Sequence, residues 1–299
     1  MLVMKLQLWD DADYVTLQTY VLERSPELSP DRRRPAVIVC PGGGYMGTSD
    51  REAEPVALRF AAQGYHAFVL RYTTYWPGFV DFATHPLPGN PKTRYPQPLF
   101  DLGKAIMVVR QHAEAWNVDP DRIAICGFSA GGHLAASLGV HWQDDFLSEQ
   151  LGVPNQSLKP NALILSYPLL DFVSMKQEVE AKASPEDKEF WRKSNLAIFG
   201  TPDPTDEERA RLSPPRHVSS SMPPTFVWHT ADDDLVYVSN ALNLASAMAA
   251  HQVPFELHVF ESGVHGMSLG DETSAGGAEH VNADSQWMRA ALKFLKRRG

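Results

Sequence analysis

The residues best suited to chemistry lie around Ser129, which stands in the pattern Gly-x-Ser-x-Gly at residues 127–131. An apolar run, residues 123–126, precedes the pattern, and mostly small and apolar residues follow it to residue 140. This order predicts a buried strand, a tight turn and a helix, the context in which a serine hydroxyl is raised into a cleft as a nucleophile. We therefore expect Ser129 to be a nucleophile. The alternative is a strand–helix turn whose serine is idle.

A serine hydroxyl needs a base to take its proton, and the base needs an acid to orient it. After a serine in this kind of turn, the acid and then the histidine are expected further along the chain. His265 follows the last predicted strand, with Gly263 and Gly266 close on either side. The flexible glycines let the imidazole reach back towards Ser129. We expect His265 to be the general base.

The acid is expected after the penultimate predicted strand, where the adjacent carboxylates Asp232, Asp233 and Asp234 stand. Three neighbouring side chains cannot all face one imidazole, so the others are expected to close the turn through hydrogen bonds to the backbone. The spacing to the apolar residues that follow favours Asp233, and Asp232 is the next candidate. Asp171 and Glu261 are more remote alternatives.

A tetrahedral intermediate carries a negative oxygen, which needs fixed N–H donors. One donor is expected from the backbone of Ala130, the residue after the nucleophile, and another from the loop that follows an early strand. Residues 41–45 form that loop, and their three consecutive glycines let the backbone approach a substrate closely. Gly43 and Gly44 are the candidates. No Gly-Lys-Ser/Thr follows, which argues against a phosphate-binding loop.

These groups must be positioned by a sheet. Continuous apolar runs, typical of strands buried on both faces, occur at residues 36–40, 66–70, 123–126, 162–166 and 225–229. Two alternating segments, 4–9 and 15–22, predict an antiparallel hairpin, and residues 256–260 predict the last strand. Helical patterns lie between the strands at 54–63, 99–116, 131–140, 240–250 and 285–294. The sequence predicts a doubly wound, mostly parallel eight-stranded α/β sheet with its active site at the carboxyl ends of the strands.

Two segments do not fit this alternation. Residues 73–98 are rich in proline, glycine and aromatic residues, and residues 171–215 contain a helix predicted to begin after Ser184, a capping residue followed by proline. Both follow strand ends, so we expect lid-like insertions over the active site of one domain spanning residues 1–299. Surface decoration is the alternative. The candidate substrate-pocket residues are Tyr45, Tyr75, Trp76 and His133, the last of which could instead only pack.

Composition limits the partners. The chain of 299 residues is 43% hydrophobic and 21% charged, with a net charge of −9, which favours a globular protein without nucleic acid or an anionic membrane as partner. The first nine residues lack the features of a signal peptide, and no apolar run is long enough to cross a bilayer. Cys40 and Cys126 each end an apolar strand, so we expect buried reduced thiols in a cytoplasmic protein. No histidine pair has metal-site spacing, and neither a metal nor a cofactor is predicted.

Five stretches of the sequence resemble one protein family. They are Pro-Gly-Gly-Gly-Tyr at 41–45, Arg-Glu-Ala-Glu-Pro at 51–55, residues 64–72, residues 119–134 around Ser129 and residues 259–266 around His265. Their order across most of the chain resembles α/β-hydrolases, in the branch of small carboxylesterases related to hormone-sensitive lipase and to acetyl esterases acting on xylan-type sugars. Pro41 stands where the lipase-like group usually has histidine, which points to the sugar-acetyl-esterase side. Tyr237 also departs from the family, which often has proline after the acid turn.

The resemblance implies an ester hydrolase that acts through Ser129, His265 and Asp233. The favoured substrate is a short-chain acyl ester, above all an acetyl group on an alcohol such as a sugar. Lactone or dienelactone hydrolysis and peptide hydrolysis by a small peptidase are alternatives within the same chemistry. A non-catalytic ligand receptor on the same scaffold is the alternative from another class, and it would be expected to have lost one of the three residues. The sequence leaves homo-oligomerisation open.

Overall fold

In the computed structural model, which describes residues 1–25, 27–28, 33–77, 85, 88–282 and 286–298, eight strands form one sheet in the order β1-β2-β4-β3-β5-β6-β7-β8. The strands are β1 (Lys5–Trp9), β2 (Ala12–Tyr20), β3 (Arg34–Cys40), β4 (His66–Arg71), β5 (Val118–Phe128), β6 (Ala162–Ser166), β7 (Thr225–Thr230) and β8 (Phe255–Phe260). The β1–β2 and β2–β4 pairs are antiparallel, and the other neighbouring pairs are parallel. The predicted mostly parallel sheet is confirmed.

The middle strands are apolar on both faces because helices cover both faces. Along β3, Val37 and Val39 belong to one buried cluster, whereas Ile38 and Cys40 belong to the other. Every residue of β6 and β7 is buried. Since successive side chains of a strand point to opposite faces, two covered faces require a continuous apolar run.

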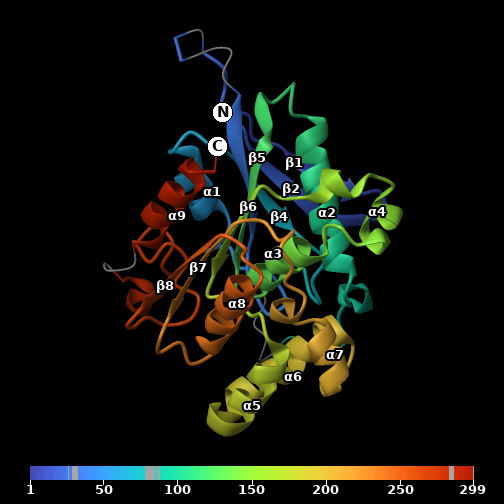
Figure 1. Cartoon of the computed structure of the whole chain (residues 1–299), viewed down its shortest axis with the longest axis vertical. Helices are drawn as coiled ribbons and strands as arrows, with labels where there is room; N and C mark the ends of the chain where they lie inside the picture. The colour runs from blue at the N-terminus through green and yellow to red at the C-terminus, as the bar shows by residue number, and fades with distance from the viewer. Residues whose placement is uncertain (26, 29–32, 78–84, 86–87, 283–285, 299) are drawn as a thin grey trace.

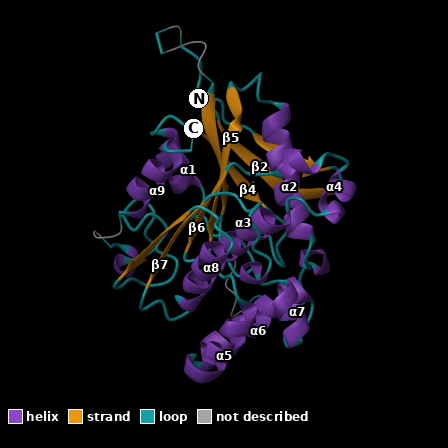
Figure 2. Ribbon diagram, viewed as in Figure 1, coloured by secondary structure: helices purple, strands orange, loops and turns teal. Residues whose placement is uncertain are grey.

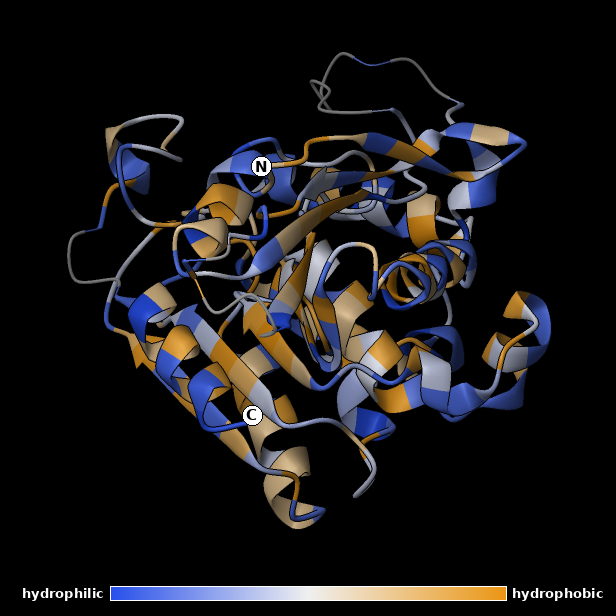
Figure 3. Ribbon diagram, turned by 90° about the horizontal axis from the view of Figure 1, so that it is seen from above, coloured by the Kyte–Doolittle hydropathy of each residue, from blue (hydrophilic) through white to orange (hydrophobic). Residues whose placement is uncertain are grey.

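The helices divide between these two faces. The first face carries α1 (Glu54–Ala61) and α9 (Trp287–Lys296), and the second carries α2 (Gln97–Gln111), α3 (Ala130–His141) and α8 (Ser239–Ala250). Figures 1 and 2 show α1 and α9 on one side of the strands and α2, α3 and α8 on the other. In Figure 3 the strands in the middle of the molecule are largely hydrophobic, and blue segments gather on the outer helices. α4 (Asp145–Leu151) lies beside α2.

The segment from 171 to 215 forms a group of helices at one end of the molecule, beyond the sheet (Figure 1). It contains α5 (Phe172–Lys182), α6 (Pro185–Phe199), α7 (Asp206–Arg211) and the 3₁₀ turn η3 (Pro214–Arg216). The predicted cap of α6 is confirmed, because the Ser184 side chain accepts from the Asp187 N–H. In the other insertion, 73–98, residues 78–84 and 86–87 lie outside the described residues. A lid function for either segment stays a prediction.

Some element boundaries differ from the expectation. β5 begins at Val118, earlier than the predicted residue 123, because Val118 pairs with Arg34 before the register shifts and pairing resumes at Ile123. α2 ends at Gln111, and the predicted continuation to Trp116 is a series of turns in which Ala113 and Trp116 are buried. α9 runs from Trp287 to Lys296, and the predicted start at residue 285 lies outside the described residues. α4, α5 and α7 were not expected. Three further 3₁₀ turns are η1 (Pro91–Thr93), η2 (Asn155–Leu158) and η4 (Ala278–His280).

Candidate active site

Ser129 lies in the turn between the end of β5 and the start of α3, as the sequence predicts. Its φ of 50° and ψ of −117° are rare for a residue with a side chain, and such backbone strain persists only where the surroundings enforce it. The flanking glycines allow the turn: a Cβ on Gly127 would lie 2.2 Å from the Gly131 carbonyl oxygen, and one on Gly131 would lie 2.0 Å from that of Cys40. The turn holds the hydroxyl at the carboxyl end of a central strand.

His265 and Asp233 lie beside Ser129 and form a continuous hydrogen-bonded chain with it. Nε2 of His265 lies 2.9 Å from Oγ of Ser129, and Nδ1 lies 2.7 Å from Oδ2 of Asp233. Gly263 and Gly266, with φ values of 150° and 79°, turn the backbone on either side of the histidine. The Asp233 carboxylate is fully buried, and the imidazole keeps 12% of its surface exposed.

The three neighbouring carboxylates in the turn that follows β7 have different contacts. Oδ1 of Asp233 accepts from the N–H groups of Leu235 and Val236 at 3.1 and 2.9 Å, which leaves Oδ2 for His265. Asp232 accepts from the Gly263 N–H at 2.8 Å, and Asp234 is exposed. Of the two remote candidates, Asp171 caps α5 and Glu261 is exposed. Among these five carboxylates, all within the described residues, Asp233 is the one that contacts His265.

The electrostatics fix the direction of these hydrogen bonds. Burial raises the pKa of the Asp233 carboxyl, but the imidazoles of His265 and His229 lower it more, so the net pKa lies well below the ordinary range. Burial lowers the pKa of His265, but the charge and hydrogen bond of Asp233 raise it above its ordinary value. An ionised Asp233 can only accept, so Nδ1 of the neutral imidazole carries the proton and Nε2 accepts from the Ser129 hydroxyl.

His229 is a neighbour of Asp233 that the sequence did not assign to the site. Its Nε2 donates to the Val236 carbonyl oxygen at 2.7 Å and lies 3.3 Å from Oδ2 of Asp233. The residue is fully buried at the end of β7. His229 precedes Asp233 by four residues, and this spacing is the sequence feature that could have indicated their contact.

The glycine loop at 41–45 is held in one conformation by bonds to its carbonyl groups. The Gly42 oxygen accepts from the Ser49 N–H, the Gly43 oxygen from those of Met46 and Gly47, and the Gly44 oxygen from the Ser194 hydroxyl. The C=O and N–H of one planar peptide unit point in opposite directions, so these bonds also fix the N–H groups of Gly43 and Gly44. Ala130 is the first residue of α3, and the first N–H groups of a helix have no partner within it.

The four candidate pocket residues are buried. The Tyr45 hydroxyl donates to Nδ1 of His133 at 2.5 Å, and Nε2 of His133 donates to the Leu212 carbonyl at 2.6 Å. Burial lowers the pKa of His133 to about 4, so the imidazole is neutral and can donate at one nitrogen while accepting at the other. Tyr75 and Trp76 form backbone bonds to Tyr45 and Met46 and are 7% and 5% exposed. Their contact with a substrate stays a prediction.

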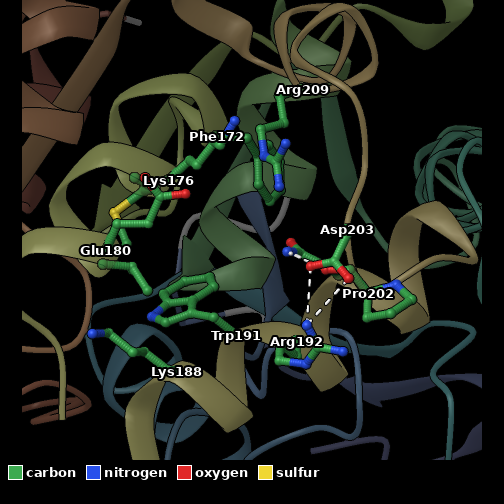
Figure 4. Close-up of a pocket in the computed structure, with 12 residues that line it drawn as sticks. Phe172, Lys176, Glu180, Lys188, Trp191, Arg192, Pro202, Asp203 and Arg209 are labelled. Carbon is green, nitrogen blue, oxygen red and sulfur yellow. Dashed lines mark hydrogen bonds and ion pairs between the residues drawn. The ribbon is translucent and has the colours of Figure 1, made fainter. Parts of the chain in front are cut away.

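A cavity of about 160 Å³ lies among α5, α6 and the segment from Pro202 to Arg209. Figure 4 shows Trp191 beside it and the Arg192–Asp203 ion pair at its edge. Ser129, Asp233 and His265 do not line this cavity. α6 therefore contacts both the cavity and the glycine loop, since Trp191 lines the cavity while the Ser194 hydroxyl donates to the Gly44 carbonyl oxygen.

Three further findings concern the described part of the chain. None of its helices has the length and apolar character needed to span a membrane. In the same residues, no group of three His, Cys, Asp or Glu side chains is arranged to hold a metal ion. Cys40 and Cys126 are buried and free, as expected.

A family model described as BD-FAE matches residues 26–248, more than half of the chain. The chain belongs to the BD-FAE family. This membership, with the relatives described next, confirms the predicted resemblance to α/β-hydrolases of the carboxylesterase and acetyl-esterase type.

The curated relatives of this BD-FAE chain are longer proteins. It is 33% identical over 261 residues to endo-1,4-beta-xylanase B of Butyrivibrio fibrisolvens, which covers 87% of this chain and 37% of that protein. It is 28% identical over 240 residues to an acetylxylan esterase of Xylanibacter ruminicola, which covers 79% of this chain and 41% of that protein. The chain therefore spans about two fifths of the length of these relatives.

Solved structures similar to this BD-FAE chain match it over nearly its whole length. The carboxylesterase Cest-2923 from Lactobacillus plantarum is 30% identical with a TM-score of 0.78, covering 100% of this chain and 98% of that one. An acetyl ester-xyloside bifunctional hydrolase from Caldicellulosiruptor lactoaceticus is 32% identical with a TM-score of 0.73, covering 98% and 96%. These likenesses confirm the α/β-hydrolase fold.

Proposed function

We propose that this BD-FAE chain is a serine carboxylic-ester hydrolase. The observation that carries the proposal is the unbroken chain of hydrogen bonds from Ser129 through His265 to Asp233. His265 accepts the proton of the Ser129 hydroxyl as its oxygen attacks the ester carbonyl carbon. Asp233 keeps the imidazole in the tautomer that can accept, and it stabilises the imidazolium that forms.

The tetrahedral intermediate places negative charge on the former carbonyl oxygen. Backbone N–H groups of Ala130 and of Gly43 or Gly44 donate to this oxygen, because preorganised donors stabilise charge that develops during the reaction. As the intermediate collapses, His265 protonates the leaving alcohol, and the acyl group stays on Ser129. A water molecule, deprotonated by His265, then attacks the acyl carbon and releases the acid.

The substrate that we propose is a short acyl ester, with an acetyl group on a sugar as the first candidate. Support comes from the acetylxylan esterase and the acetyl ester-xyloside hydrolase among the similar proteins. Pro41, in place of the histidine of the lipase-like group, agrees with this direction.

The first test is covalent labelling with an organophosphonate, which reacts with an activated serine. We expect labelling of the wild type and none of the Ser129→Ala variant. The wild type should then hydrolyse acetylated xylo-oligosaccharides faster than lactones or peptide amides. Labelling without turnover of any acetyl ester would contradict the substrate class, and absence of labelling would favour a non-catalytic receptor.

A further inference from the structure

The segment Arg51–Glu52 matches the family resemblance, but the reaction above gives it no role. Glu52 is 3% exposed, and its carboxylate accepts two hydrogen bonds, both from uncharged donors. The Gly42 N–H donates to Oε2 at 2.7 Å, and the Tyr167 hydroxyl donates to Oε1 at 2.7 Å. A buried charge is costly to desolvate, and here no cation repays that cost at either bond. A residue kept only for packing would not need this charge.

One oxygen of the Glu52 carboxylate holds the glycine loop at 41–45, which carries the proposed oxyanion donors and is called the oxyanion loop below. The peptide unit between Pro41 and Gly42 is fixed from both sides, because the Tyr72 hydroxyl donates to the Pro41 oxygen at 2.7 Å and Glu52 accepts from the Gly42 N–H. A Cβ added to Gly42 would lie 2.8 Å from Cβ of Ser129 and 2.9 Å from Oε2 of Glu52. The loop backbone is therefore tightly placed between the nucleophile and the carboxylate. A shift of Glu52 would move the N–H donors relative to Ser129.

The other oxygen of the carboxylate is connected through Tyr167 to the loop that carries His265, residues 263–268. The Tyr167 hydroxyl accepts from the Ser268 N–H at 2.8 Å while it donates to Glu52. The Tyr167 ring stands edge-on to the imidazole of His265, with ring centroids 5.0 Å apart. Arg51 supports the same loop, since it donates to the Gly266 carbonyl at 2.7 Å.

We propose that Glu52 is a positioning residue that holds the oxyanion loop and His265 in place beside Ser129. Its two oxygens connect two segments that each lie next to Ser129, 41–45 and 265–268. Its charge also acts on His265. Burial lowers the pKa of the imidazole, Asp233 raises it, and Glu52 raises it further. The inference rests on the proposed ester hydrolysis.

The decisive variant is Glu52→Gln, which keeps the shape of the side chain and an acceptor for Gly42 but removes the charge. The matched control is Glu54→Gln in the same segment, whose carboxylate accepts from the Tyr20 hydroxyl at 3.1 Å away from the reacting groups. With p-nitrophenyl acetate we expect Glu52→Gln to lower kcat by about 10- to 100-fold, less than full loss of an oxyanion donor, with KM within about threefold. Its acid limb of kcat/KM should move to lower pH, and the control should show neither change.

Three outcomes separate the proposals. If the wild type neither turns over esters nor reacts with a phosphonate, the proposed function fails and this inference fails with it. If the wild type is active and Glu52→Gln keeps its kcat and pH profile, only the role of Glu52 is wrong, even if the thermal midpoint falls. If Glu52→Gln does not fold, Tyr167→Phe replaces it, and we expect about a 3- to 10-fold loss of kcat from the lost hydroxyl link. An unchanged kcat in Tyr167→Phe would then overturn the proposal.

Discussion

Asp233 lies between two histidines, with its Oδ2 atom 2.7 Å from Nδ1 of His265 and 3.3 Å from Nε2 of His229. Its other oxygen is occupied by two N–H groups of its own turn. The carboxylate is therefore held in a single orientation, and small changes at this position should affect the imidazole directly.

We predict that Asp233→Asn lowers kcat by up to about 10⁴-fold, because an amide that donates to Nδ1 favours the wrong tautomer of His265. Asp232→Asn should cost far less, since the asparagine oxygen can still accept from Gly263, and Asp234→Asn changes an exposed side chain. Steady-state kinetics of the three variants on one acetyl ester provide the measurement. A crippling Asp232→Asn with a mild Asp233→Asn would contradict the geometry of this turn.

The pH dependence of kcat/KM should report His265. Its imidazole must be neutral to accept a proton, so activity falls as the pH drops through its pKa in the free enzyme. Because Asp233 raises that pKa above the ordinary value, we expect the midpoint of the acid limb above about 6.5. A midpoint well below that value in a pH series at constant ionic strength would show that the charge of Asp233 does not dominate burial.

Replacing the nucleophile gives a direct prediction. Ser129→Ala should retain the fold and abolish turnover, because loss of the serine nucleophile in another serine hydrolase costs about 10⁶-fold in kcat. The thermal midpoint and the far-ultraviolet circular dichroism spectrum control for the fold. Turnover that persists above about one per cent of the wild type, where 10⁶-fold loss is expected, would exclude Ser129 as the nucleophile.

Much of this arrangement follows from local sequence patterns. The strands that carry Ser129 and Asp233 are continuous apolar runs, and the glycines around Ser129 and His265 mark the turns where these side chains leave the sheet. After a serine in this kind of turn, the acid and then the histidine follow along the chain, and this order identifies the remaining two residues. Local patterns are sufficient here because each side chain follows the end of its own strand.

The features that could not be predicted from the sequence depend mainly on contacts between segments that are distant along the chain. Glu52 meets Tyr167 across 115 residues, and nothing near residue 52 indicates that partner. α7 has one buried residue, Arg209, so it lacks the apolar stripe by which a helix is predicted. Tyr45 and His133 were expected to line a pocket because of their place in the chain. Both are buried and hydrogen-bonded to each other, a contact that forms where the glycine loop packs against α3.

Acyl length is the next testable property. We predict that kcat/KM for p-nitrophenyl acetate exceeds that for the decanoate. The loop aromatics Tyr45, Tyr75 and Trp76 are buried and packed, and the cavity among α5, α6 and the 202–209 segment is not lined by Ser129. We therefore expect a long acyl chain to find little apolar contact beside Ser129. Faster hydrolysis of the decanoate would contradict the acetyl-ester proposal and favour a lipase-like pocket.

The bond between Tyr45 and His133 leads to a prediction about stability. Tyr45→Phe removes the hydroxyl that donates to Nδ1 of a fully buried imidazole, and the residue keeps its aromatic packing. An unsatisfied buried acceptor costs about 1–3 kcal/mol, so the free energy of unfolding in urea should fall by that amount. Tyr14→Phe is the control, because its hydroxyl accepts from Asn90 in a partly exposed position, and it should change the free energy by less than about 0.5 kcal/mol. Equal effects of the two substitutions would mean that His133 finds another donor when Tyr45 is changed.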